Sequence, residues 1–264
     1  MLASSIFVAA LISGPTQHEL ALAAKAQVVH RRDQLLSPRP YRGVLPGADL
    51  GYAARGRHNT HVVSLSFAMG SLRSGPDFEY ERAGELRSTE PSLATMLDLR
   101  YAYGRRLAGE RWSVSLGATL PVHIEAMNWV YGPLGNFNYL GVFALGPWAQ
   151  LRLEPAARHL IELELGAPIV AWVARSPYAL NDDDFIAANA DHAPGKAAFR
   201  LIGQGRFESL DTYQSVDLRG SWAFALHERW ALVSTLGFWF AHESKPRPLS
   251  ALHFSAMFGA RGSF

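Results

Sequence analysis

Hydrophobic and polar residues alternate along most of this chain, and residues 253–264 show the pattern clearly. Phe254, Phe258 and Phe264 fall on one set of alternate positions, whereas Arg261 falls on the other. A period of two places the two sets on opposite faces of a β-strand. Twelve residues at roughly 3.3 Å each span about 40 Å, enough to cross a bilayer core. The pattern predicts a strand with one face toward lipid and the other toward a polar interior.

Eight earlier segments repeat this alternation. The predicted strands are 48–55, 61–70, 92–104, 112–126, 139–153, 159–173, 212–226, 230–241 and 253–264. Segment 230–241 leaves its register open, because its second face, with Val233 and Trp239, is less polar than the others. Connections alternate between short and long. The short turns are 56–60, 105–111, 154–158 and 227–229, and the long loops are 71–91, 127–138, 174–211 and 242–250.

This alternation indicates that the two ends of the sheet face different surroundings, and tight turns make neighbouring strands antiparallel. A chain that enters from the short-turn end needs one more strand before 48–55. Residues 27–37 are the candidate, although their alternation is poor. We expect an all-β fold, a single closed antiparallel up-and-down transmembrane β-barrel of about ten strands, with eight or twelve as alternatives. A soluble β-barrel or sandwich has the same alternation but does not need such long strands.

With its uncharged strand faces, alternating loops and final strand ending at Phe264, the chain resembles bacterial outer-membrane β-barrel proteins over about residues 48–264. The resemblance implies an outer-membrane location with both termini in the periplasm, contact with outer-membrane lipid, and recognition of Phe264 by the assembly machinery. Aromatic residues agree, because such barrels carry aromatic girdles at both interfaces. The expected interface aromatics are Tyr101, Tyr103, Trp112, Trp222 and Trp230 near the short turns, and Trp129, Tyr131 and Tyr139 near the long loops.

Composition adds exclusions. Charged residues make up 18% of the chain and hydrophobic residues 48%, yet the body of the chain has no uncharged apolar run long enough for a helical membrane span. The absence of cysteine excludes disulfides and thiol chemistry. A net charge of +2 without basic clusters argues against nucleic-acid binding.

The first residues suggest a targeting segment. Residues 2–13 form an apolar run of signal-peptide length, and Ala24-Lys25-Ala26 resembles a cleavage site. No basic residue precedes the run, so a buried N-terminal helix or strand is the alternative. We expect a signal or targeting segment at 1–26 and a barrel at 27–264, with 174–211 as a long external loop.

In a membrane barrel, the polar strand faces point into the lumen, where charges must be paired. The expected lumen charge network comprises Asp49, Asp98, Arg100, His123, Glu125, Arg152, Glu162, Glu164, Asp217, Arg219 and Arg261, together with Arg55 and His253. Acids and arginines are nearly balanced in this set. A barrel of about ten strands is little wider than the eight-stranded kind that side chains fill. A plug of ion pairs is therefore favoured over an open channel.

Candidate chemistry is sparse. His253 and Ser255 share a strand face but lack a third polar partner, and Asp191-His192 and His242-Glu243 are acid–histidine neighbours in rim loops. Asp182, Asp183 and Asp184 form an oxygen-rich candidate for Ca²⁺, with a solvated acidic loop as the alternative. We expect no catalytic residues and no cofactor.

The functional expectation is a non-enzymatic barrel that anchors or supports a partner in an outer-membrane assembly. Loop 174–211 is the expected contact, because it carries apolar residues such as Phe185 and Phe199. A small-solute pore and an outer-membrane hydrolase are the alternatives.

Overall fold

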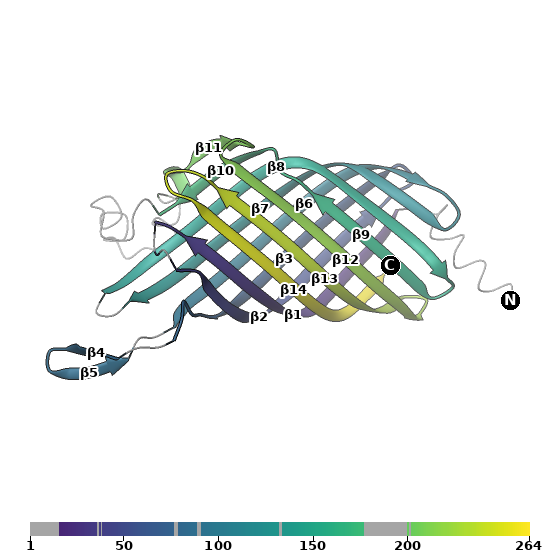
Figure 1. Ribbon diagram of the computed structural model, residues 1–264. Helices are drawn as coiled ribbons and strands as arrows, with labels where there is room; N and C mark the ends of the chain where they lie inside the picture. Colours follow the sequence, from purple (N-terminus) through teal and green to yellow (C-terminus); the bar gives the residue numbers. More distant parts are fainter. Residues whose placement is uncertain are drawn as a thin grey trace.

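The computed structural model describes residues 16–35, 37, 39–76, 79–88, 91–131, 134–176, 200 and 202–264, and these form a closed antiparallel β-barrel (Figure 1). The strands are β1 (Gln17–Asp33), β2 (Tyr41–Arg55), β3 (Asn59–Leu72), β4 (Glu79–Arg82), β5 (Glu85–Ser88), β6 (Ser92–Ala108), β7 (Trp112–Tyr131), β8 (Leu134–Ala156), β9 (His159–Gly166), β10 (Val170–Arg175), β11 (Arg206–Ser209), β12 (Tyr213–His227), β13 (Trp230–Glu243) and β14 (Leu249–Ser263).

The wall has ten strand positions over the described ranges, as the sequence predicts. Strands β9 and β10 together occupy one position, because both pair with β8. The barrel closes where β1 pairs with β14, in a register running from Glu19 opposite Ser263 to Asp33 opposite Leu249. This closure pairs the first and last strands of the wall, as backbone groups in lipid require.

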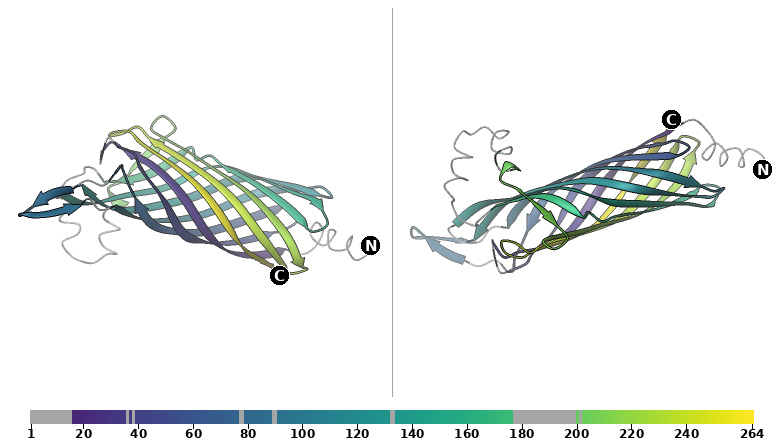
Figure 2. Two further views of the ribbon diagram at one scale, coloured as in Figure 1. Left: turned by 60° about the horizontal axis from the view of Figure 1, so that its bottom comes forward. Right: turned by 90° about the horizontal axis from the view of Figure 1, so that it is seen from above.

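The two ends of the barrel differ. Short turns and the C-terminus lie at one end, here called the short-turn end, whereas the long connections lie at the other, the long-loop end (Figure 1). Strands β4 and β5 form a separate hairpin that projects beyond the barrel at the long-loop end (Figure 2). Its turn uses Ala83 at φ 53° and Gly84 at φ 81°, the left-handed backbone that a tight two-residue hairpin requires.

The outer surface of the barrel is apolar along its length. Leu22, Leu65, Leu163, Leu236 and Phe258 are between 41% and 67% exposed. Leu65 lies between Ser64 and Ser66, and Leu163 between Glu162 and Glu164, which face inward. No helix among the described residues is long and apolar enough to span a membrane. An apolar exterior around a closed antiparallel barrel identifies the fold as a transmembrane barrel of the outer-membrane type.

The first strand corrects a prediction. We expected it at 27–37, but β1 occupies Gln17–Asp33. Residues 17–26 therefore belong to the barrel, and a boundary at residue 26 would cut β1 in two. The alternation begins earlier than expected because Glu19 and Lys25 face inward, where they are buried. A targeting segment before residue 16 stays a prediction, since those residues lie outside the described ranges.

Three predicted loops contain strands, and in one of them, 174–211, the strand is β11. Strands β7 and β8 continue through most of 127–138, pairing as far as Tyr131 opposite Leu134. The stretch 71–91 contains β4 and β5. In these last two loops backbone pairing continues where side-chain alternation ends, because a hairpin ladder does not depend on an apolar face.

The interior is not charged throughout. Toward the long-loop end, an apolar cluster fills the lumen, with Val29, Leu45, Leu72, Met96 and Met127 all fully buried. A second cluster includes Leu140, Val142, Tyr213 and Leu249. These residues lie at inward positions that the pattern alone would assign to polar groups, and they close that part of the lumen to water.

One wall position is interrupted. Pro168 separates β9 from β10, and as a proline it cannot donate a ladder hydrogen bond. Below this break β12 pairs with β9, from Asp217 opposite Gly166 to Phe224 opposite His159. Above it β10 pairs with the short strand β11 instead. The wall is therefore interrupted on the side where the segment 174–211 leaves and returns.

Candidate functional site: the charged lumen and its two mouths

The lumen near the short-turn end contains a cluster of five charged residues, here called the arginine cluster: Glu19, Arg55, Arg152, Glu162 and Arg261. Arg55 lies 2.6 Å from Glu19 and 2.9 Å from Glu162. Arg152 lies 3.2 Å from Glu19 and 3.3 Å from Glu162. Arg261 contacts both carboxylates as well. Three guanidinium groups thus share two carboxylates, and the cluster carries an excess positive charge.

A second layer lies deeper in the barrel. Arg100 pairs with Glu164 at 2.5 Å, and Gln150 donates to the same carboxylate at 2.9 Å. Arg219 pairs with Asp217 on its own strand at 3.3 Å. Asp49 also faces inward, and its buried Oδ2 has no hydrogen-bond partner among the described residues.

The middle of the lumen holds a chain of polar contacts around His123. Its Nδ1 lies 2.6 Å from Asp98, and its Nε2 lies 3.8 Å from Glu125. Lys25 lies 3.8 Å from Asp98 and donates to the Ser66 hydroxyl at 2.6 Å. These groups come from β1, β3, β6 and β7, so the contacts join neighbouring strands and also link β1 to strands two and three positions away.

Rings stack beside this chain. Trp239 contacts both His123 and His253, with ring centroids 4.6 Å and 4.5 Å away, and the two imidazole centroids are 5.7 Å apart. Gln27 lies 3.0 Å from His253 Nδ1. That nitrogen is therefore engaged by an amide rather than by Ser255, and the two residues do not form a Ser–His pair.

The long-loop end has its own network. Arg31 contacts Glu125, Asp33 at 2.9 Å and Asn138 at 3.0 Å. Arg175 contacts Asp33 and lies 3.1 Å from Glu243. Arg206 on β11 lies 2.8 Å from Glu243 and also contacts Glu208. The network ties the irregular part of the wall to β1 and β13.

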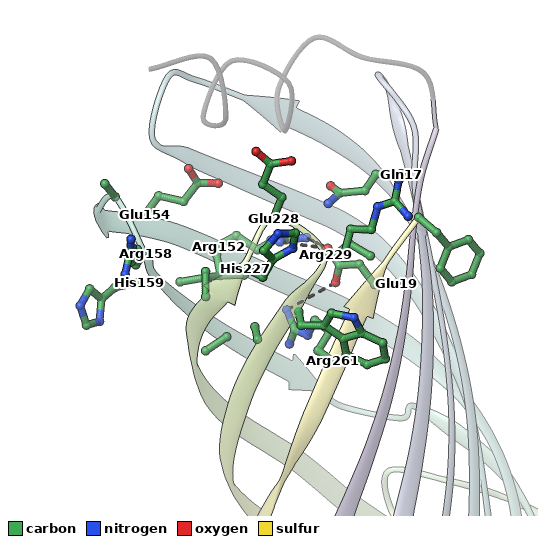
Figure 3. Close-up of a pocket in the computed structure, with 18 of the residues that line it drawn as sticks. Gln17, Glu19, Arg152, Glu154, Arg158, His159, His227, Glu228, Arg229 and Arg261 are labelled. Carbon is green, nitrogen blue, oxygen red and sulfur yellow. Dashed lines mark hydrogen bonds and ion pairs between the residues drawn. The ribbon is translucent and has the colours of Figure 1, made fainter. Parts of the chain in front are cut away.

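Empty space in the lumen is divided. Two internal cavities measure about 110 Å³ and about 30 Å³. A larger cavity of about 380 Å³ opens at the short-turn end, over Glu19, Arg152 and Arg261 (Figure 3). Layers of ion pairs and the apolar clusters therefore separate this mouth from the long-loop end.

The structure brings all the expected lumen charges to the inner face of the barrel. The buried ones are Arg100, His123, Glu125, Arg152 and Glu162, and the partly buried ones are Asp49, Asp98, Glu164, Asp217, Arg219 and Arg261. Glu19, Lys25, Arg31, Asp33, Arg175 and Glu243 are further members that the sequence did not reveal. The first four lie on β1, and the inward period of two from Glu19 to Asp33 is the signal that could have identified them.

Most expected interface aromatics point outward. Tyr101, Tyr103, Trp112, Trp222 and Trp230 are between 37% and 58% exposed. Tyr139 differs from these, because it is only 7% exposed and its hydroxyl donates to Gln204 at 3.4 Å. It nevertheless lies on the outer side of the wall, because it pairs with Ala126, which alternates with the lumen-facing Glu125 and Met127. The side chains of Trp129 and Tyr131 lie outside the described part of the chain. Phe264 lies at the rim and is 73% exposed.

The remaining chemical candidates gain little support. His242 Nδ1 lies 3.0 Å from the Ser250 hydroxyl, while Glu243 contacts arginines. Asp182, Asp183, Asp184 and the Asp191-His192 pair fall outside the described residues. Within the described ranges, no group of three or more acidic or histidine side chains is placed to hold a metal ion.

No protein-family model and no curated protein sequence matches this chain. Its structure is similar to the outer-membrane protease OmpT of Escherichia coli, at 8% identity over 94% of this chain and 96% of that chain, with a TM-score of 0.45. It is similar to the translocator domain of the autotransporter NalP of Neisseria meningitidis, at 10% identity over 96% and 90%, with a TM-score of 0.43. It is also similar to the attachment invasion locus protein Ail of Yersinia pestis, at 10% identity over 95% and 99%, with a TM-score of 0.32. None of these similarities assigns a role to a residue of this chain.

Proposed function

We propose that this outer-membrane barrel does not conduct solutes and instead anchors or supports a partner at the membrane. The main observation behind this proposal is that an ion pair and a hydrogen bond join side chains from opposite walls of the lumen. Arg152 on β8 pairs with Glu19 on β1, and Arg31 on β1 bonds to Asn138 on β8. Those two strands are five positions apart in the wall. Charged side chains that meet across a narrow barrel fill it.

Planar-bilayer recording tests the closed lumen. We expect no steady single-channel steps from the purified barrel. A pore would give reproducible steps, and that result would refute the proposal. The double variant Arg31→Ala with Glu125→Ala is the comparison expected to leak. It removes both members of a buried ion pair in the long-loop half, so neither charge remains without the other. We expect it to raise the leak above the wild-type level.

The supporting role is assigned to the long-loop end. In this proposal the short turns and both termini face the periplasm, and the β4–β5 hairpin faces outward, following the loop asymmetry of outer-membrane barrels. The chain lacks cysteine, so single cysteines report orientation. We expect a membrane-impermeant maleimide to label Leu86→Cys on whole cells but not Arg57→Cys. The reverse pattern would overturn the orientation.

The proposed contact with the partner lies within 174–211, of which the structure describes 174–176, 200 and 202–211. Phe207 and Leu210 are 78% and 51% exposed at this end, which is more apolar surface than a solvated loop needs. After mild extraction and crosslinking, we expect a partner to co-purify with the wild-type chain and to be reduced in Leu210→Ala. Leu107→Ala is the matched control, because Leu107 is 67% exposed at the opposite end. A wild-type chain that always runs alone would remove this part of the proposal.

A small pore is the second candidate. The cavity of about 380 Å³ and the internal cavity of about 110 Å³ share Glu19 and Arg261 in their linings, so a second hollow lies next to the mouth. The apolar clusters weigh against continuation to the far end. The same bilayer recording distinguishes the two candidates.

A further inference from the structure

The cavity at the short-turn end has the shape of a binding site rather than of a gap between turns. Its volume of about 380 Å³ lies within the roughly 300–1,000 Å³ of small-molecule sites. The turns at Ala156–Arg158 and His227–Arg229 form its rim, and Glu19, Arg152 and Arg261 of the arginine cluster form its floor (Figure 3). It lies at the opposite end of the barrel from the surface proposed for a partner.

Small residues create this space. Ala223 and Ala225 on β12 and Ala231 on β13 line the cavity. Ala225 and Ala231 are direct cross-strand partners. Beside them on the same inner surface stand long side chains such as Arg152 and Arg261. The three alanines leave a hollow beside the charged floor, with Leu160 and Trp230 as further apolar lining.

The charge of the lining selects the ligand. Its side chains include Arg152, Arg158, Arg229 and Arg261 against Glu19, Glu154 and Glu228, and the carboxylate of Phe264 lies at the rim. The positive excess lies at the floor, because Glu19, Arg152 and Arg261 belong to the arginine cluster, in which Arg55, Arg152 and Arg261 form ion pairs with two carboxylates, Glu19 and Glu162. A buried cluster with one guanidinium too many is stabilised by one more anionic group, and arginine forks suit carboxylate or phosphate oxygens.

We propose that this cavity binds a small amphiphile with one anionic group. The anionic head contacts Arg152 and Arg261 at the floor, and the apolar body lies against the alanine surface. The ligand enters from the short-turn end and does not cross the barrel, because the cavities beyond the cluster are smaller. This binding site does not depend on the proposal that the barrel is non-conducting, since it requires only the cavity at the short-turn end.

Octanoate is the probe, with octanol as its neutral counterpart. Titration calorimetry on the full chain in phosphatidylcholine nanodiscs, with empty nanodiscs subtracted, measures binding. We expect one octanoate per chain and at least tenfold weaker binding of octanol. Equal binding of the two would overturn the proposal, because the charge of the floor would then have no role. Heat equal to that of empty nanodiscs would also overturn it.

Two variants locate the site. Ala225→Leu fills the hollow without changing charge, and we expect it to weaken octanoate binding at least tenfold. Ala48→Leu is the matched control, because Ala48 faces outward on β2, and it should bind as the wild type does. Arg261→Gln removes the excess charge, and we expect it to lose the preference for octanoate over octanol. Heat-modifiable gel mobility confirms that each variant is folded. Unchanged binding in Ala225→Leu would place the ligand elsewhere and refute the proposal.

The anionic group could belong to a soluble molecule or to a lipid. Nanodiscs containing phosphatidylglycerol separate these sources. If octanoate binds more weakly in phosphatidylglycerol nanodiscs than in phosphatidylcholine nanodiscs, a lipid phosphate competes with octanoate for the arginines at the floor. If it does not, a soluble anion is the ligand. Both results support the anion site and differ only in its source.

Discussion

A guanidinium nitrogen of Arg152 lies 3.2 Å from a carboxylate oxygen of Glu19 on the opposite side of the barrel. Both side chains are almost fully buried, so neither charge is compensated by bulk water. Glu19 also contacts Arg55 at 2.6 Å. Its carboxylate therefore fastens β1, the strand that closes the barrel, to β2 and β8.

Replacing Glu19 should be strongly destabilising. Glu19→Gln leaves three arginines around a single carboxylate, and breaking a buried ion pair in this way costs roughly 3–5 kcal/mol. The free energy of unfolding by guanidinium in liposomes measures it. Glu85→Gln is the control, because its pair with Arg87 is exposed and belongs to the projecting hairpin. Equal stabilities of the two variants would contradict the importance of the arginine cluster.

Lipid contact is tested by two leucines of similar exposure. Leu236 is 67% exposed on the barrel wall, and Leu86 is 70% exposed on the β4–β5 hairpin. If the wall faces hydrocarbon, Leu236→Arg should lower the free energy of unfolding by about 2–4 kcal/mol. Leu86→Arg should change it by less than about 0.5 kcal/mol, as at an ordinary solvated surface. Similar small effects at both positions would indicate a soluble barrel.

Strands β6 and β7 approach closely at Gly117, and this contact is the basis of a third prediction. A Cβ at Gly117 would lie 2.0 Å from the carbonyl oxygen of Tyr103. Gly117→Ala must therefore shift the β6–β7 ladder, and we expect a loss of about 1–3 kcal/mol. Gly51→Ala is the matched control, because the nearest heavy atom to its Cβ would be 3.7 Å away. The measurement is the same unfolding titration, and an unaffected Gly117→Ala would show that the ladder adapts.

The β4–β5 hairpin should be dispensable for folding. Its strands pair only with each other among the described residues, as a separate two-stranded sheet. Replacing residues 79–88 with a short glycine-serine linker should leave heat-modifiable mobility and refolding yield unchanged. A variant that fails to form the folded band would show that the hairpin contributes to assembly. Refolding into liposomes without any cellular factor keeps the result a property of the chain.

Strand periodicity predicted the barrel because lipid and lumen impose opposite demands on alternate residues. Segments such as 112–126 carry that contrast over many residues, and β7 starts at Trp112 as expected. The alternation of apolar and polar residues ends where a strand extends beyond both the lipid and the lumen. The β7–β8 ladder continues to Tyr131 and Leu134, where pairing rather than burial maintains the strands.

The lumen was harder to predict than the wall. Inward positions tolerate a charged residue, such as Glu125, or an apolar one, such as Met127, as long as the neighbours across the lumen complement it. Both of these residues are fully buried. Which strands face each other across the barrel depends on the strand count and on β1. The cavity beside Ala225 and Ala231 depends on the same information, because single alanines carry no signal until their strands are aligned.

The closing pair of strands brings the first described residues to the end of the chain. The backbone amide of His18 donates to the carbonyl of Phe264 at 3.1 Å, and the reverse bond measures 3.0 Å. The first and last strands therefore pair with each other as neighbouring strands do elsewhere in the wall. The pairing itself does not mark where the chain begins. A circular permutant that joins residue 16 to residue 264 through a short linker and opens in the β4–β5 hairpin would keep the described strand pairs of the wall while moving Phe264 into the interior of the sequence. It would separate what a terminal aromatic residue contributes to cellular assembly from what the closed ring contributes to stability.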